Sequence, residues 1–208
     1  DRVEQRSARR PREHDDLGLA DQVLGRDHAH AGRHLDTAVD RVVAVVAHHE
    51  VVASRNSEDI GVIELTVRLE VDTETGFVTL LKHWVVEDCG TIVNPQLVDE
   101  QIRGGVVQGF GAALFEKCIY DERGQLTNAS MADYLVPMSG EMPDIEVGHV
   151  VSPTQESELG AKGAGEAGTA GAAAAVANAV NDALRPFGAT ITEIPLTPQV
   201  ILTALGRI

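Results

Sequence analysis

The chain has 208 residues, enough for one domain with a buried core or for two small ones. Its formal net charge of −15 argues against nucleic acids and anionic membrane surfaces as partners. No stretch approaches the roughly 20 apolar residues that span a bilayer, and the N-terminus has no signal-peptide pattern, so we expect a soluble, cytoplasmic protein. The two cysteines, Cys89 and Cys118, lie far apart and predict neither a zinc site nor a disulfide framework.

The first 56 residues differ in composition from the rest. They contain nine arginines, ten acidic residues and six of the eight histidines, but no lysine and no aromatic residue. A segment without aromatic anchors has little with which to build a core. We therefore interpret 1–56 as an atypical segment, either disordered or mistranslated from another frame or strand, and its histidines as scattered surface residues. Its one apolar patch, 38–53, fits a helix or an aggregation-prone strand.

Two long strands are predicted at the start of the remaining chain. The segment 60–72 alternates apolar and polar residues, as a half-buried strand does, and 77–88 fits the returning strand. Between them, 73–76 favours a turn in which Gly76 takes a positive φ. Together these segments predict a β-hairpin.

Pro95 then opens a predicted helix over 96–116. Each glycine in a helix interior costs about 1 kcal/mol relative to alanine. Such glycines usually allow a close approach to the backbone, and either a second helix or a bound ligand fits that role. The helix contains four of them: Gly104, Gly105, Gly109 and Gly111.

Strands and helices alternate through the rest of the chain. The patterns predict a second hairpin over 117–130, a strand over 144–151, an alanine-rich helix over 167–187, a short strand over 190–195 and a last helix over 197–205. This mixture predicts an α+β fold, a mixed sheet with hairpins packed against glycine- and alanine-rich helices.

The most unusual stretch is GAKGAGEAGTAG, residues 160–171, where one carboxylate, Glu166, stands among glycine and alanine. Its G-x-G-x-x-G spacing over 163–168 matches the dinucleotide-binding fingerprint, but that fingerprint follows a strand immediately, and here a polar segment with Pro153 intervenes. A P-loop is excluded because no Lys-Ser or Lys-Thr pair follows the glycines.

The same stretch also fits a wall of bare backbone beside a ligand. The predicted helix from 167 aims its positive end at this place. The helix dipole keeps Glu166 ionised, whereas desolvation favours its neutral form, and the two effects together can leave a base usable near neutral pH. The structural alternative is that Glu166 merely caps the helix.

Two long motifs resemble a known family. VEDCGTIVNPQLVDEQIRGGVVQGFGAALFE (86–116) and GAKGAGEAGTAGAAAAVANAVNDAL (160–184) are similar to the C-terminal part of the molybdopterin-binding large subunits of molybdenum hydroxylases. These enzymes include xanthine dehydrogenase, aldehyde oxidase and aerobic carbon monoxide dehydrogenase. The resemblance covers residues 60–205 and not 1–56, so 57–208 is expected to be a partial C-terminal molybdopterin-binding domain.

The resemblance implies roles for matching residues. Glu166 would be the active-site base beside molybdenum, and Gln108 would hydrogen-bond the pterin. Four neighbours would line the pterin or the metal through backbone groups: Lys162, Gly163, Ala164 and Gly165. The resemblance assigns none of them as a metal ligand.

Three further motif positions are interpreted mainly as structural, holding turns and helix ends: Asp88, Asn94 and Gln101. The resemblance also implies a molybdopterin cofactor in its cytosine dinucleotide form. The implied partners are iron–sulfur and FAD subunits, the remainder of the large subunit and a small-molecule substrate.

The parent enzyme would oxidise an aldehyde, an N-heterocycle or carbon monoxide with water as the oxygen source. The segments that distinguish these substrates in the family do not occur here, so the substrate stays open and the chain alone is expected to be inactive. Two alternatives remain: a dinucleotide-binding module using the loop 163–168, and a non-catalytic domain that complements a second chain.

Overall fold

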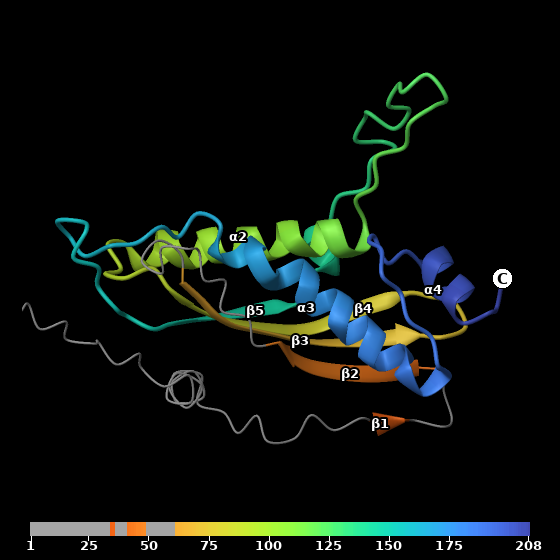
Figure 1. The fold of residues 1–208 in the computed structure, drawn as a ribbon, viewed down its shortest axis with the longest axis horizontal. Coiled ribbons are helices and arrows are strands. Elements are labelled where there is room, and N and C mark those ends of the chain that lie inside the picture. The colour runs from red at the N-terminus through yellow and green to blue at the C-terminus, as the bar shows by residue number, and fades with distance from the viewer. Residues whose placement is uncertain (1–33, 36–40, 49–60) are drawn as a thin grey trace, which may run out of the picture.

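The computed structural model describes residues 34–35, 41–48 and 61–208 (Figure 1). Most of the predicted atypical segment 1–56, including four of its six histidines, lies outside these residues, and the boundary near residue 57 stays a prediction. Within the apolar patch, 41–48 forms a strand, which is one of the two structures expected for it.

The fold is α+β, as predicted. Its strands are β1 (His34–Leu35), β2 (Arg41–His48), β3 (Gly61–Asp72), β4 (Val78–Asp88) and β5 (Asp144–His149). Its helices are α2 (Pro95–Leu114), α3 (Ala167–Leu184) and α4 (Pro198–Ala204), with short 3₁₀ turns at Ser139–Glu141 and Arg185–Phe187. In the described part of the chain, no helix is both long and apolar enough to cross a bilayer.

The five strands form one mixed sheet in the order β1-β2-β3-β4-β5. Neighbouring strands are antiparallel except β4 and β5, which run parallel because the connection between them contains α2. The predicted hairpin is confirmed as β3 and β4, and Gly76 in its turn has φ +76°. Asp72 tightens this turn by accepting the backbone N–H groups of Glu74 and Thr75.

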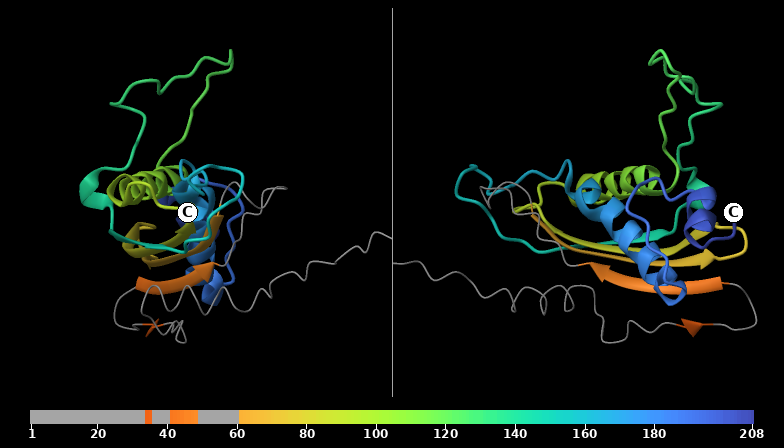
Figure 2. Two further views of the ribbon diagram at one scale, coloured as in Figure 1. Left: turned by 90° about the vertical axis from the view of Figure 1, so that its left-hand side faces the viewer. Right: turned by 45° about the vertical axis from the view of Figure 1, so that its right-hand side comes forward.

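Both long helices lie on the same face of the sheet (Figures 1 and 2). α3 packs on β2 and β3, and α2 packs on α3 and β5. The alternation in β3 buries Leu65, Val67, Leu69 and Val71, and α3 buries a row of alanines and valines among which Ala172 and Val176 are fully covered. The apolar faces that the sequence pattern predicts for the strand and the helix therefore pack together in one core.

Glycines let α2 and α3 approach closely. A Cβ at Gly168 would lie 2.2 Å from the carbonyl oxygen of Ile102, and a Cβ at Gly109 would lie 2.6 Å from Ala172 Cβ. Both distances are below what real Cβ atoms adopt. Of the two explanations offered for these helix glycines, a second helix applies to Gly105 and Gly109, which face α3.

The helix ends follow local chemistry. The side chain of Asn94 caps α2 by accepting the N–H of Leu97 at 3.2 Å, and Pro95 occupies the first turn. Thr197 caps α4 in the same way by accepting the N–H of Val200. α3 ends at Leu184 in a 3₁₀ turn that contains Pro186, slightly earlier than the predicted 187.

The expected strand over 190–195 is wrong, and the second predicted hairpin is reduced to a turn with one antiparallel bridge. The segment 190–195 is irregular and contains a cis Ile194–Pro195 peptide, and Asn181 on α3 satisfies the backbone N–H and C=O of Ile191 instead of a neighbouring strand. Residues 117–130 keep the predicted turn, with Gly124 at φ +77°, but have only one isolated bridge, Tyr120–Leu126.

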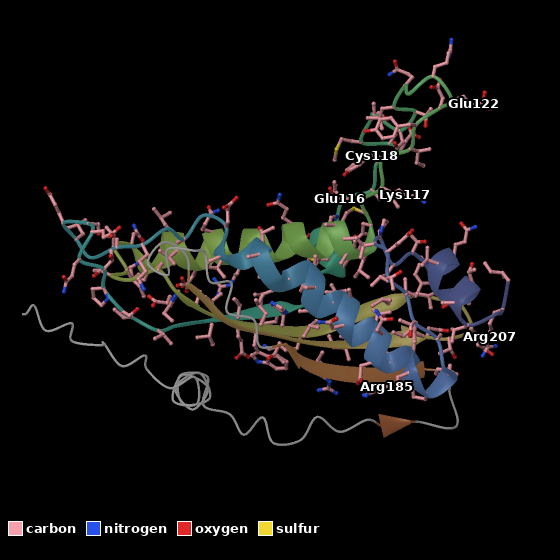
Figure 3. All side chains as sticks on the ribbon, in the orientation of Figure 1. Glu116, Lys117, Cys118, Glu122, Arg185 and Arg207 are labelled. Atoms are coloured by element: carbon pink, nitrogen blue, oxygen red, sulfur yellow. The ribbon has the colours of Figure 1, made fainter. Side chains whose placement is uncertain are left out.

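That second segment belongs to an arm, residues 117–138, that projects from the end of α2 (Figures 1 to 3). Side chains rather than a strand ladder hold its base. Asn128 accepts the N–H of Ile119 and donates to the carbonyl of Lys117, and the Tyr134 hydroxyl donates to Glu116. The arm therefore has no sheet neighbour to impose strand geometry on it.

Two alanine substitutions in α2 test the close helix packing. Gly109→Ala places a methyl group against Ala172, and we expect it to lower the free energy of unfolding by about 1–3 kcal/mol. Gly104→Ala is the matched control, because a Cβ there meets nothing within 4 Å, and the better helix former should stabilise by up to about 1 kcal/mol. Urea denaturation followed by circular dichroism gives both values, and equal stabilities would contradict the packing.

Candidate functional site

The candidate site lies where the parallel strands β4 and β5 end and the helices α2 and α3 begin. β4 leads through Cys89 and Gly90 into α2, and β5 leads through the loop 150–166 to the start of α3 (Figure 1). The carboxyl ends of parallel strands and the N-termini of helices are common places for ligands in folds that contain both. The glycine-rich stretch identified in the sequence lies at this end of the molecule.

Asp88, at the end of β4, anchors the first half of this stretch. Its carboxylate accepts the backbone N–H of Gly90 at 2.7 Å, the ammonium of Lys162 at 2.8 Å and the hydroxyl of Ser152. Burial raises the pKa of Asp88, but the hydrogen bonds from Lys162, Ser152 and Gly90 outweigh it and lower the pKa overall. The structural role predicted for Asp88 is thus a buried, fully bonded charge.

The backbone reinforces this anchor. The N–H of Lys162 donates to the carbonyl of Cys89 at 2.7 Å, and Thr91 donates to the carbonyl of Gly160. Gly90 and Gly160 both have positive φ, and a Cβ on Gly90 would lie 2.3 Å from the Gly160 oxygen. The N–H and ammonium of Lys162, which was expected to line a cofactor through its backbone, are therefore both already used within the chain.

The second half of the stretch lies against α2. The side-chain amide of Gln101 donates to the carbonyl of Gly165 at 2.9 Å. The hydroxyl of Thr169, in the first turn of α3, donates to the carbonyl of Gly105 at 3.0 Å and lies 3.4 Å from Gln108 Oε1. The structure thus brings Gln108 and the residues beside Glu166 together, although they are far apart in the sequence.

Glu166 immediately precedes α3 and its side chain is exposed. Its carbonyl accepts the N–H groups of Thr169 and Ala170, both at 3.1 Å, but its carboxylate makes no capping bond. The alternative that Glu166 merely caps the helix is therefore not supported. A negative side chain at this end of an 18-residue helix is nevertheless favoured by the helix dipole.

One face of α2 beside Glu166 carries little bulk. Gln101, Gly104 and Gln108 are spaced to share a helix face, and all three are exposed. A Cβ at Gly104 or at Gly165 would meet nothing within 4 Å, and neither glycine has a positive φ. We name the surface formed by Gly104, Gln108 and residues 163–166 the open face; Gln101 borders it and is bonded to Gly165. No packing or backbone strain within the described chain explains Gly104 or Gly165.

A second cluster of polar residues, not identified from the sequence, consists of His149, Glu87 and Asp99. His149, at the end of β5, hydrogen-bonds Glu87 through Nδ1 and Asp99 through Nε2, the latter at 2.7 Å. Burial raises the pKa of Glu87 even though its bond to His149 acts in the opposite direction. Burial lowers the pKa of His149, but its bonds to Asp99 and Glu87 outweigh burial and raise it overall.

Glu87, Asp99 and His149 come from β4, α2 and β5, and no sequence pattern predicted their contact. His83 lies on β4, four residues before Glu87, and differs from His149 because neither of its ring nitrogens has a hydrogen-bond partner among the described residues. Its ring meets Phe110 edge-on at 5.1 Å, and burial lowers its pKa to about 3. His83 is therefore a neutral core residue, whereas His149 links sheet and helix through its hydrogen bonds to Glu87 and Asp99.

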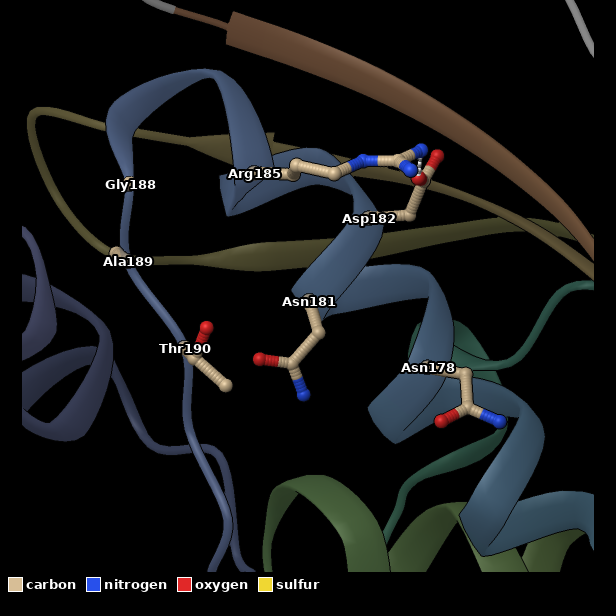
Figure 4. A pocket seen from close by; sticks show the side chains of 7 residues that line it. All are labelled: Asn178, Asn181, Asp182, Arg185, Gly188, Ala189 and Thr190. Atoms are coloured by element: carbon tan, nitrogen blue, oxygen red, sulfur yellow. Dashed lines mark hydrogen bonds and ion pairs between the residues drawn. The ribbon is translucent and has the colours of Figure 1, made fainter.

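A separate cavity lies away from this site. A space of about 550 Å³ opens at the C-terminal end of α3, where Asp182 pairs with Arg185 and Asn181 points towards Thr190 (Figure 4). The 18 residues of α3 separate it from Glu166 by about 27 Å at 1.5 Å per residue. Its Asn181 is engaged with the 190–195 segment, so we assign this cavity no part in the site.

Comparison with known proteins gives an independent view of the chain. Residues 48–143 match the family model described as molybdopterin cofactor-binding domain. The nicotine 6-hydroxylase large subunit of Paenarthrobacter nicotinovorans is 48% identical over 136 residues, which are 65% of this chain and 17% of that protein. The carbon monoxide dehydrogenase large chain of Afipia carboxidovorans is 33% identical over 127 residues, 61% of this chain and 16% of that protein.

Solved structures agree with these matches. Quinoline 2-oxidoreductase from Pseudomonas putida 86 superposes with a TM-score of 0.67 at 39% identity, covering 70% of this chain and 18% of that one. A Cu,Mo carbon monoxide dehydrogenase gives a TM-score of 0.65 at 30% identity, with 69% and 18% coverage. The chain thus spans about a sixth of the length of the relatives that it matches.

The His149 link predicts a measurable titration. NMR of the imidazole protons should give a pKa above 6.5 for His149, and Glu87→Gln or Asp99→Asn should lower it, because each removes an acidic partner. Because the folded pKa exceeds the unfolded one, this group stabilises the fold below about pH 6.5 and loses that contribution as pH rises through the folded value. The signal is assigned by its loss in His149→Gln, and a midpoint at or below 6.5 would contradict the link.

Proposed function

Because the chain belongs to the molybdenum hydroxylase large-subunit family, we propose that its open face forms one wall of the molybdopterin site and that Glu166 is the catalytic base. The observation that carries this proposal is the contact between α2 and α3 in which Thr169, three residues after Glu166, lies 3.4 Å from Gln108 Oε1. The family match and the structural likeness support a molybdopterin-binding role, and the residue assignments are our own.

The open face fits a pterin. A pterin is a flat heterocycle with hydrogen-bond donors and acceptors along its edge, so it needs polar groups beside a surface without bulky side chains. Gly104 and Gly165 leave that room, and the amide NH₂ of Gln108 makes no hydrogen bond to the described residues. Gln108 would therefore hold the pterin edge, while the backbone of Gly163, Ala164 and Gly165 would line it.

The bound molybdenum–pterin group would acidify water and accept two electrons from the substrate. Glu166 would accept the proton of the water-derived nucleophile as its oxygen adds to an electron-poor carbon, and the hydrogen of that carbon would leave with the two electrons of its C–H bond. The Asp88–Lys162 ion pair holds the start of the loop, so Glu166 starts from a fixed backbone. The carboxylate is exposed in this chain, so the walls that exclude water from it would come from the remainder of the large subunit.

Among the substrates considered, we favour an N-heterocycle. The support is that two relatives with high identity, 48% and 39%, are named for nicotine and quinoline, whose rings contain nitrogen. Ring carbons of such molecules are electron-poor, as attack by a water-derived nucleophile requires. The test is turnover of pyridine- and quinoline-type compounds by the holoenzyme, compared with benzaldehyde and carbon monoxide.

We further infer that the parent enzyme works with separate electron-transfer subunits. Iron–sulfur and FAD subunits would carry the electrons away from the molybdopterin site. One relative is a subunit of a 6-hydroxypseudooxynicotine dehydrogenase complex, which supports such an assembly. The cytosine dinucleotide form of the cofactor, a cytoplasmic location and the inactivity of this chain alone remain our predictions.

The dinucleotide-binding alternative has less support. β5 ends at His149, well before the glycines, and no described strand follows α3 to complete a βαβ unit. A non-catalytic domain that complements a second chain remains compatible with the open face. Loss of turnover in a Glu166 variant would separate the catalytic proposal from that one.

Glu166→Gln, in the assembled holoenzyme, tests the base directly. The substitution keeps the shape of the side chain but removes its basicity, so we expect kcat to fall by at least about 10²-fold while molybdenum and pterin content are unchanged. Glu158→Gln, an exposed carboxylate in the same loop, is the control and should keep full activity. Normal turnover by Glu166→Gln would refute the proposal.

Gly165→Ala tests the bare wall. The chain itself has room for the methyl group, so folding should be unaffected, whereas a pterin lying on the backbone would be displaced. We expect molybdenum and pterin per large subunit to fall severalfold, measured by metal analysis and pterin fluorescence. Gly140→Ala, also open but distant from the site, is the control, and full occupancy in Gly165→Ala would mean that no cofactor approaches Gly165.

A further inference from the structure

The side chain of Gln101 contacts the loop before α3, 64 residues away in the sequence. It lies on the exposed face of α2, where a glutamine side chain ordinarily extends into water. Instead its Nε2 donates to the carbonyl of Gly165 at 2.9 Å, across the gap between α2 and the loop. Among the described residues this is the only hydrogen bond found for 163–165, since the Asp88 anchor ends at Lys162.

The bonded carbonyl belongs to the peptide unit that enters Glu166. The following peptide unit is fixed too, because the carbonyl of Glu166 accepts the N–H groups of Thr169 and Ala170. With both flanking peptide planes hydrogen-bonded, the direction of the Cα–Cβ bond of Glu166 is set. Without Gln101, the plane before Glu166 is free to rotate, because glycines on that side impose little restraint.

We propose that Gln101 is a positioning residue that sets the direction of the Glu166 carboxylate relative to the open face. This inference rests on the proposed function, since it matters only if Glu166 is the base. Gln101 touches neither substrate nor reacting atoms in this proposal and acts through the Gly165 peptide alone. Misplacement of a catalytic group by about 1 Å can cost about 10²-fold in rate, so a single tether of this kind is sufficient to matter.

The test uses Gln101→Met in the holoenzyme, because methionine keeps the length and helix propensity of glutamine but cannot donate. We expect kcat to fall about ten- to a hundredfold with KM changed less than about twofold. Molybdenum and pterin content should stay at the wild-type level. Gln96→Met, on an exposed position at the start of the same helix, is the matched control and should match the wild type.

A readout without turnover comes from hydrogen exchange. Peptides that cover 160–170 should exchange faster in Gln101→Met than in the wild type, while peptides from α4 should be unchanged. Normal kcat and unchanged exchange in Gln101→Met would overturn the inference. Loss of molybdenum would overturn it as well, because Gln101 would then hold the cofactor or the fold rather than direct Glu166.

Glu166→Gln, assayed in parallel, separates this inference from the proposal on which it rests. If Glu166→Gln is inactive and Gln101→Met has normal kcat, only the positioning role fails. If Glu166→Gln turns over normally, the catalytic assignment itself fails and the positioning role fails with it.

Discussion

The close approach of α2 and α3 is the constraint on which the rest of the structure depends. Gly109 and Gly168 bring the two backbones to distances at which any Cβ would overlap the facing helix. This approach allows the hydroxyl of Thr169 to reach the carbonyl of Gly105 and places the start of α3 against Gln108. Larger side chains at the crossing would separate the helices and, with them, the parts of the candidate site.

Hydrogen bonds and one ion pair hold the loop that precedes α3. The loop before α3 has too few side chains to pack, so it depends on hydrogen bonds at its ends, to Asp88 on one side and to Gln101 on the other. Asp88 is buried, and four donor groups from Gly90, Ser152 and Lys162 compensate the cost of removing its charge from water. The result is a backbone held in place without side chains that would obstruct a ligand.

The same arrangement explains why the open face looks incomplete. Gly104 and Gly165 have empty space above them, and Glu166 is exposed, although the sheet side of the same helices is tightly packed. A chain that spans about a sixth of its relatives leaves room for other segments to cover this face. The proposed pterin would lie against this wall.

Sequence by itself determined the local elements and the family. Alternation in 60–72 and 77–88, the Asn94–Pro95 start of α2 and the alanine-rich α3 are decided by neighbouring residues, so their signals are readable in order along the chain. Only the tertiary structure decided the contacts of Gln101 with Gly165 and of His149 with Glu87 and Asp99. These partners are dozens of residues apart, and a side chain's partner depends on how whole elements pack, which local pattern does not encode. The failed strand at 190–195 has the same cause, since Asn181 of α3 takes the hydrogen bonds that a neighbouring strand would have made.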